Sequence, residues 1–152
     1  MNPHPFTLHC REKGIEHFGY DRSEAPGAGA AGGLGYAFLQ YFNAKARPGA
    51  ELLLEKIGFD TLIQNADLVI TGEGHSDRQT LMGKLPQRIL EHVTNQKIWL
   101  VSGGVSDRQA MLDAGFDRVI QVTPDNMPLD VALKPDVARN NMIKAIIMEE
   151  KQ

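Results

Sequence analysis

The sequence has one cysteine, no run of basic residues and no long apolar segment, and each of these shortages excludes a class of protein. Cys10 alone forms neither an internal disulfide nor a multi-cysteine metal site, which fits a reducing compartment. The longest apolar runs, such as 98–101, are far too short to cross a bilayer. No apolar core of signal-peptide length occurs in the opening MNPHPFTLHCREKG. We therefore expect a soluble, cytoplasmic protein with no membrane partner.

Charge and length narrow the choice further. Lysine and arginine total 16 against 19 acidic residues, which leaves a net charge of -3 and no basic face for nucleic acid. The 152 residues, 42% of them hydrophobic, are enough for one domain with a core and too few for two ordinary ones. We expect a single α/β domain over 1–152, with a peripheral N-terminal helix within 1–24.

The order of the apolar patterns predicts the fold class. Short apolar runs are expected to be strands at 67–71, 97–102 and 118–123. Helical patterns are expected at 4–19, 36–42, 50–57, 80–95, 107–114 and 134–149. Strands that alternate with helices in this way predict parallel pairing with crossover connections. The expected fold is α/β, a mostly parallel sheet of at least three strands flanked by helices, with Rossmann-like or flavodoxin-like layering. Trp99 lies mid-strand and is expected in the core.

A glycine-rich segment, APGAGAAGGLG at 25–35, precedes one of these helices. Small residues let backbone N–H groups approach an anion, and the following helix adds its positive end. The candidate anion donors are Gly27, Gly29, Gly32 and Gly33. The segment is not a Walker A loop, since no Gly-Lys-Ser/Thr follows, and no clear strand precedes it as in a dinucleotide fingerprint. The alternative is a glycine-rich turn packed tightly under another helix.

The most polar segment, GEGHSD at 72–77, follows the first expected strand. In open parallel sheets, ligands bind beyond the carboxyl ends of the strands. Glu73 and Asp77 are therefore candidates to bind Mg²⁺, or one of them to accept a proton from a substrate hydroxyl. Lys84 is a candidate contact for a phosphate or carboxylate. The alternative for Asp77 is a helix cap with no chemical role.

His75 stands between these two carboxylates in the sequence. A histidine titrates near neutrality and is able to take part in the chemistry, although an exposed loop histidine is more often a bystander.

Three motifs together resemble the type I glycerate kinase family: PGAGAAGG (26–33), ADLVITGEG (66–74) and D-x-QT-x-x-GK (77–84). The resemblance covers nearly the whole chain and weakens over the first twenty or so residues. It implies ATP-dependent phosphorylation of D-glycerate to phosphoglycerate, with a divalent metal such as Mg²⁺. We also expect Glu73 and Asp77 to line one solvent-accessible cleft together with part of residues 27–33, because both glycine-rich motifs would serve one anionic ligand.

Two departures from the family pattern qualify this expectation. Family members are more than twice as long, and their N-terminal motifs are absent here, so the chain corresponds to the C-terminal part. The family commonly has Arg-Ile where this chain has His75-Ser76, and Arg78 stands where a small polar residue is usual. Losing an arginine removes a bidentate anion donor, a role that Arg78 is placed to take over.

From these departures we expect the isolated chain to be nearly inactive as a kinase. We also expect it to self-associate or to pair with the absent N-terminal portion, through apolar residues of the helix at 36–42. The alternatives are a non-catalytic truncated fragment and a small-anion-binding α/β module.

Overall fold

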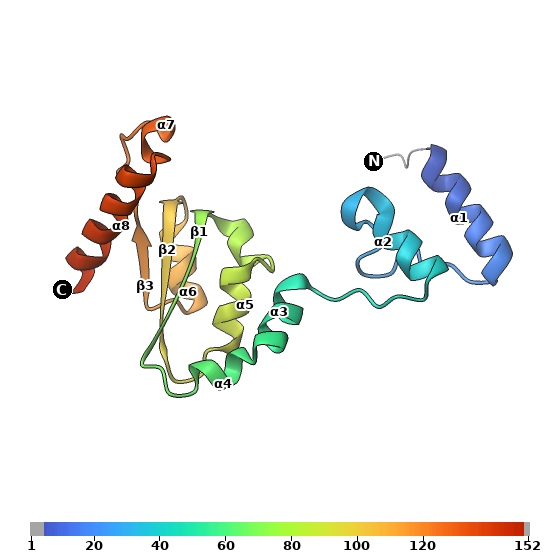
Figure 1. Cartoon of the computed structure of the whole chain (residues 1–152), viewed down its shortest axis with the longest axis horizontal. Coiled ribbons are helices and arrows are strands. Elements are labelled where there is room, and N and C mark those ends of the chain that lie inside the picture. Colours follow the sequence, from blue (N-terminus) through green and yellow to red (C-terminus); the bar gives the residue numbers. More distant parts are fainter. Residues whose placement is uncertain (1–4, 151–152) are drawn as a thin grey trace. The chain divides into compact units, whose positions relative to one another are not determined.

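The computed structural model describes residues 5–150 of the chain (Figure 1). The chain divides into two compact units, Met1–Gly49 and Ala50–Gln152. The expectation of one domain over 1–152 stays a prediction. Within the described residues, no helix is long and apolar enough to span a membrane.

The first unit contains two helices, α1 (Pro5–Phe18) and α2 (Ala30–Tyr41), which contact one another. The expected helix at 4–19 is confirmed over its described part. Gly14 weakens α1 by propensity, but a Cβ there would lie 2.7 Å from the hydroxyl of Tyr36. The small residue therefore permits the close approach of the two helices.

Gln40 of α2 holds the segment between α1 and α2 in place through hydrogen bonds. The Gln40 side chain is fully buried. Its Nε2 donates to the carbonyl of Tyr20 at 2.8 Å, and its Oε1 accepts from the amide of Arg22 at 3.0 Å. A buried amide with both ends paired stabilises this connection without leaving an unsatisfied polar group.

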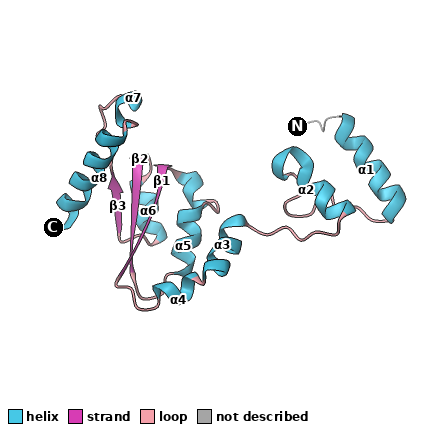
Figure 2. Ribbon diagram, viewed as in Figure 1, coloured by secondary structure: helices cyan, strands magenta, loops and turns pink. Residues whose placement is uncertain are grey.

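The second unit is built on a three-stranded parallel sheet with the order β1-β2-β3 (Figure 2). The strands are β1 (Leu68–Ser76), β2 (Lys97–Val105) and β3 (Arg118–Gln121). Both neighbouring pairs are parallel, so all three carboxyl ends lie on one edge. The α/β fold class and the placement of the strand ends are confirmed.

The remaining elements are helical. They are α3 (Gly49–Ile57), α4 (Phe59–Ile63), the 3-10 turn η1 (Arg78–Leu81), α5 (Leu85–His92), α6 (Arg108–Ala114), α7 (Leu129–Ala132) and α8 (Pro135–Glu150). Helices α5 and α6 contribute Ile89 and Met111 to a core that includes Leu100. Helix α8 contacts β3 from the opposite side of the sheet, where the chain from α7 leads into it (Figure 1).

Trp99 is not in the core, contrary to the expectation. Its neighbour Leu100 is fully buried against α5 and α6, and alternation along a strand sends Trp99 to the other face. There it is half-buried with the Arg118 guanidinium 5.1 Å from its ring centroid. On the same face Ile70 is 52% exposed. Both faces of this strand are apolar in the sequence, so the pattern does not indicate which face packs more closely against helices.

The strand ends and the following helix also differ from the expectation. Residues 72–76 and 103–105 continue β1 and β2, where loops were expected. A Cβ on Gly72 would collide with the Val101 carbonyl oxygen, so glycine here allows close strand approach. The helix expected over 80–95 is a 3-10 turn and a shorter α5, separated by Gly83 at φ 93°. Leu85, the first residue of α5, is exposed.

Candidate functional site

Asp77 begins the turn η1 at the carboxyl edge of the sheet. Its Oδ1 accepts from the amide of Gln79 at 2.8 Å. Its own amide donates to the Thr80 hydroxyl at 3.1 Å, which completes a capping box. The prediction that Asp77 caps a helix is therefore confirmed, with the 3-10 turn η1 as the element that it caps. The cap uses Oδ1, and Oδ2 accepts no hydrogen bond from the part of the chain that the structure describes.

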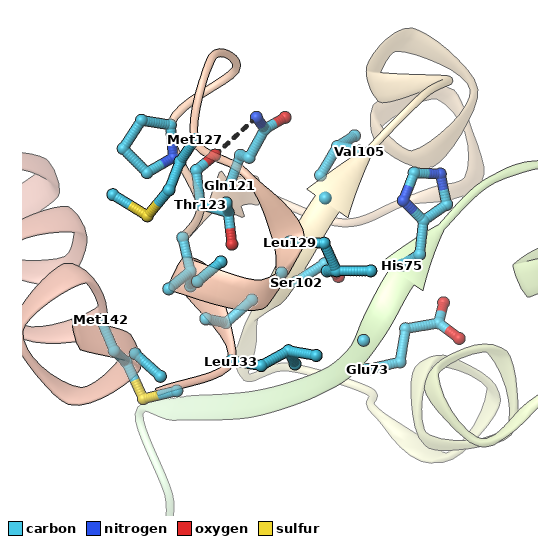
Figure 3. A pocket seen from close by; sticks show the side chains of 18 of the residues that line it. Glu73, His75, Ser102, Val105, Gln121, Thr123, Met127, Leu129, Leu133 and Met142 are labelled. Carbon is cyan, nitrogen blue, oxygen red and sulfur yellow. Dashed lines mark hydrogen bonds between the residues drawn. The ribbon is translucent and has the colours of Figure 1, made fainter. Parts of the chain in front are cut away.

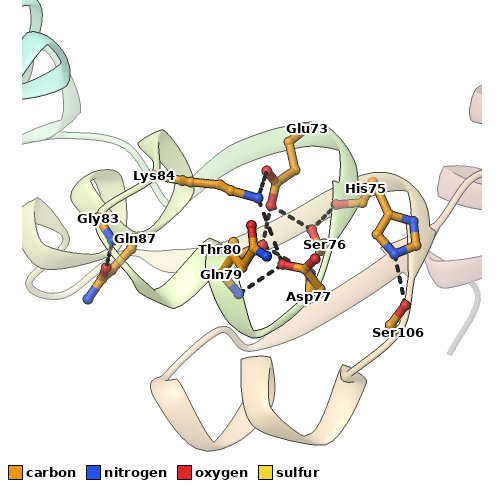
Figure 4. A network of polar contacts seen from close by, with 11 residues as sticks. Glu73, His75, Ser76, Asp77, Gln79, Thr80, Gly83, Lys84, Gln87 and Ser106 are labelled. Atoms are coloured by element: carbon orange, nitrogen blue, oxygen red, sulfur yellow. Dashed lines mark hydrogen bonds and ion pairs between the residues drawn. The ribbon is translucent and has the colours of Figure 1, made fainter. Parts of the chain in front are cut away.

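Lys84 joins the two candidate carboxylates (Figure 4). Its Nζ lies 3.8 Å from Glu73 Oε2 and 3.8 Å from Asp77 Oδ1. These three side chains, which the sequence singled out, therefore form one cluster, called here the Glu73–Asp77–Lys84 cluster. A partly exposed ion pair at this distance contributes little to stability. Its effect is to offset the repulsion between two neighbouring negative charges.

A series of hydrogen-bonded hydroxyl groups, called here the hydroxyl chain, holds one oxygen of the Glu73 carboxylate. Its Oε1 accepts from Thr80 Oγ1 at 2.5 Å and from Ser76 Oγ at 3.0 Å. Ser76 Oγ lies 2.5 Å from Ser102 Oγ on the neighbouring strand. All three hydroxyl-bearing residues are buried. One oxygen of Glu73 is therefore fixed by the protein, and the other faces Lys84.

Sequence reasoning missed this hydroxyl chain. The sequence marks Ser76 only as a departure from a family pattern and does not indicate a contact with Ser102. The available signal was the presence of small polar residues at the ends of two otherwise apolar strands. The contact between them depends on the parallel register, which pairs Glu73 with Ser102.

His75 and Arg78 have partners outside the cluster. The Nε2 atom of His75 lies 2.8 Å from the Ser106 hydroxyl. Arg78 is 83% exposed and its Nε lies 3.7 Å from Asp107 Oδ1, at the start of α6. The structure thus brings neither side chain into a hydrogen bond or ion pair with Glu73 or Asp77, and their roles in binding stay predictions.

The donor set allows a magnesium ion only with help from other ligands. No group of three or more His, Cys, Asp and Glu side chains that fits a metal occurs within residues 8–149. Mg²⁺ commonly takes one or two protein carboxylates and completes its shell with water and substrate phosphates. Glu73 Oε2 and Asp77 Oδ2 fit that limited role, and they do not form an all-protein cage.

A cavity of about 670 Å³ adjoins the cluster (Figure 3). It lies between the carboxyl ends of the strands and the α7–α8 segment. Glu73 and His75 line it on the side of β1. The opposite wall includes Met127, Leu129, Leu133 and Met142. Helix α7, which forms part of that wall, was not expected from the sequence.

The glycine-rich segment of the first unit folds into a tight turn at the start of α2. Backbone φ is positive at Gly27, Gly32 and Gly33, with values of 90°, 67° and 98°. The amide of Tyr36 donates to the carbonyl of Ala28 at 2.8 Å. A Cβ on residue 35 would collide with the carbonyl oxygen of residue 27. These contacts match a closely packed glycine turn, which was the alternative to a phosphate cradle.

The same turn borders a smaller cavity of about 250 Å³. Gly29 and Gly33 line it together with Arg11 and Glu24. The Arg11 guanidinium is paired with Asp21 at 2.6 Å. Anion binding by Gly27, Gly29, Gly32 and Gly33 therefore stays a prediction, as does a cleft shared with the Glu73–Asp77–Lys84 cluster.

Comparison with known proteins gives a consistent set of matches. The model of the Glycerate kinase family matches residues 8–148. The chain is 37% identical to "Glycerate kinase" of Bacillus subtilis (strain 168) over 114 residues, covering 73% of this chain and 30% of that protein. It is 31% identical to "Glycerate 2-kinase" of Escherichia coli (strain K12) over 117 residues, covering 75% and 31%.

A solved structure shares the fold as well. It is a crystal structure from Salmonella typhimurium LT2 of a protein provisionally named glycerate kinase 2, with a TM-score of 0.66 and 28% identity. The match covers 91% of this chain and 36% of that one. The chain spans about a third of the length of the curated relatives it matches.

Proposed function

The chain belongs to the glycerate kinase family, and on that premise we propose that it forms part of an ATP-dependent kinase acting on D-glycerate. The observation that carries the proposal is the Glu73–Asp77–Lys84 cluster at the carboxyl edge of the parallel sheet. This edge is where open α/β sheets bind ligands. Phosphoryl transfer depends mainly on positioning and charge stabilisation, which such a cluster can supply.

Asp77 is the residue best placed for chemistry. Its Oδ1 is used by the cap, whereas Oδ2 accepts no hydrogen bond within the described residues. We assign Oδ2 as the acceptor of the proton from the attacking glycerate hydroxyl. The hydroxyl oxygen then bonds to the γ-phosphorus, the bond from that phosphorus to the bridging oxygen breaks, and ADP leaves. Alternatively, Oδ2 holds the metal.

Glu73 and Lys84 have supporting roles in this proposal. Thr80 and Ser76 hold Glu73 in place, so that Oε2 presents a fixed negative charge toward Lys84. The Lys84 side chain is 41% exposed, and its ammonium is a compact charge on a flexible stem, which suits a contact with a phosphate or a carboxylate. Mg²⁺, when bound with ATP, would neutralise phosphate charge, and Glu73 and Asp77 are the residues that would hold it.

The other candidate residues are proposed to bind substrate or phosphate. Gly27, Gly29, Gly32 and Gly33 are proposed as amide donors to an anion at the start of α2. His75 and Arg78 are proposed as substrate contacts that require their present partners to be exchanged. The cytoplasmic location also stays a proposal.

We propose that the 152-residue chain alone has little or no kinase activity. Transfer requires nucleotide, metal and acceptor to be held in line and away from water. The cluster offers two carboxylates and one lysine, all partly exposed to solvent. Phe38 on α2 and Phe42 directly after it are exposed apolar residues, and they support self-association or pairing with another polypeptide.

A chimera tests the proposal. Residues 8–148 replace the matching segment of the Bacillus subtilis protein, and turnover is followed by coupled ADP release. Asp77→Asn keeps the shape and removes the charge, so turnover should fall about a hundredfold or more, with a much smaller rise in the ATP Michaelis constant. Asp60→Asn, on α4, is the control and should leave turnover unchanged. Unchanged turnover in Asp77→Asn would mean that Asp77 is only a cap.

A further inference from the structure

The cavity between the strand ends and the α7–α8 segment points to the position of one substrate. We propose that it binds the adenine base of the nucleotide, with the phosphates directed toward Lys84. This inference rests on the proposed function, which requires both a nucleotide and glycerate. The volume of about 670 Å³ lies within the usual range for small-ligand sites.

The apolar wall favours the base over glycerate. Leu129 and Leu133 of the α7 region are 71% and 70% exposed, and Met142 of α8 is 47% exposed. Figure 3 draws these three side chains among those that line the cavity. A purine has two flat apolar faces able to cover them. Glycerate has three carbons that carry a carboxylate and two hydroxyls. It has no apolar surface with which to cover these side chains, so they would remain exposed to water.

Gln121 lines the cavity, and two hydrogen bonds hold its side-chain amide in an orientation that suits recognition of the edge of a base. Gln121 Nε2 donates to the carbonyl of Thr123 at 2.8 Å and to Asp125 Oδ1 at 2.6 Å. Both protons of this amide are therefore committed, and Oε1 accepts no hydrogen bond from any described residue. A fixed carbonyl oxygen is a partner for the exocyclic amine of adenine.

The cavity and the proposed chemical site share Glu73. Glu73 lines the cavity, and its Oε2 lies 3.8 Å from Lys84 Nζ. Gly103 and Gly104 also line the cavity, where the carbonyl of Gly74 and the imidazole of His75 on β1 pack against them. A molecule with an apolar planar end and an anionic end fits this arrangement.

The test is calorimetric binding to the 152-residue chain, which needs no turnover. Adenosine, ATP with Mg²⁺ and D-glycerate are the probes. Adenosine should bind and compete with ATP. Leu133→Arg should weaken both nucleoside and nucleotide about tenfold, which corresponds to about 1.4 kcal/mol. The matched control is Leu62→Arg on α4, where the leucine is 68% exposed and lines none of the cavity; it should change nothing.

Two further variants separate the pocket from the phosphate contact. Lys84→Met should weaken ATP and leave adenosine unchanged. Met142→Arg places a charge on the same wall from another helix and should repeat the effect of Leu133→Arg if that variant misfolds by circular dichroism.

The failures are distinguishable. If ATP depends on Lys84 but neither Leu133→Arg nor Met142→Arg affects it, the base lies elsewhere; the pocket inference is then wrong and the proposed function stands. If neither ATP nor adenosine binds, the pocket inference is wrong, and the chimera then decides the proposed function separately. If adenosine binds equally well to wild type and to both wall variants, the pocket inference is wrong.

Discussion

Thr80 is the residue whose removal should most clearly reveal how the site is held together. Its hydroxyl donates to Glu73 Oε1 and accepts from the Asp77 amide, and the side chain is fully buried. Thr80→Val keeps the shape and removes both hydrogen bonds. A hydrogen bond to a charged group contributes about 1.5–3 kcal/mol, and a neutral one about 1 kcal/mol. Ser76 still donates to Glu73 and limits the damage.

We therefore expect Thr80→Val to lower the free energy of unfolding of the second unit by about 2–4 kcal/mol. Urea denaturation followed by the fluorescence of Trp99 measures this, because Trp99 is the only tryptophan and lies in that unit. Thr80→Ser retains the hydroxyl and should lose only about 0.8 kcal/mol, the value of one buried methyl-sized group.

Thr61→Val on α4 is the control, since that threonine is exposed. It should change stability by less than about 0.5 kcal/mol. If Thr80→Val is as stable as Thr61→Val, the hydroxyl chain does not hold Glu73 and the reasoning is refuted.

Two other features make separate predictions. The Asp60 carboxylate, 2.5 Å from His92 Nδ1, raises the pKa of His92 above its usual value, and Glu51 adds to this. The resulting stability is fully present below the unfolded pKa, about 6.5, and is lost as the pH rises through the folded pKa. The advantage of wild type over His92→Gln in urea denaturation should therefore shrink across that interval; an advantage that grows would contradict the pairing. Gly14→Ala should speed amide hydrogen exchange in α1 despite a better helix propensity, because the new Cβ meets Tyr36 at 2.7 Å; slower exchange would show that the helices do not pack as described.

The fold was predictable because its main signal is local. Apolar runs alternating with helical patterns require parallel strands, whatever the details of packing. The ends of the elements were less predictable, since glycine normally weakens a strand. At Gly72 the same residue is instead what lets β1 approach Val101 on β2, and nothing in the local pattern distinguishes these two uses.

The candidate site was predictable only where its residues are near in sequence. Glu73, Asp77 and Lys84 fall on one strand end and the turn after it, so their grouping followed from spacing. The contact of Ser76 with Ser102 joins residues 26 positions apart and depends on strand register. The cavity depends likewise on how the α7–α8 segment lies against the sheet.

The most direct test of the central claim is product formation by the chimera that carries residues 8–148. Phosphorus-31 NMR should detect phosphoglycerate when ATP, Mg²⁺ and D-glycerate are all supplied, and the signal should disappear with Asp77→Asn. The 152-residue chain alone should give little or none. If the chimera folds but forms no phosphoglycerate, or if Asp77→Asn forms it at the wild-type rate, the assignment of the Glu73–Asp77–Lys84 cluster to phosphoryl transfer is wrong.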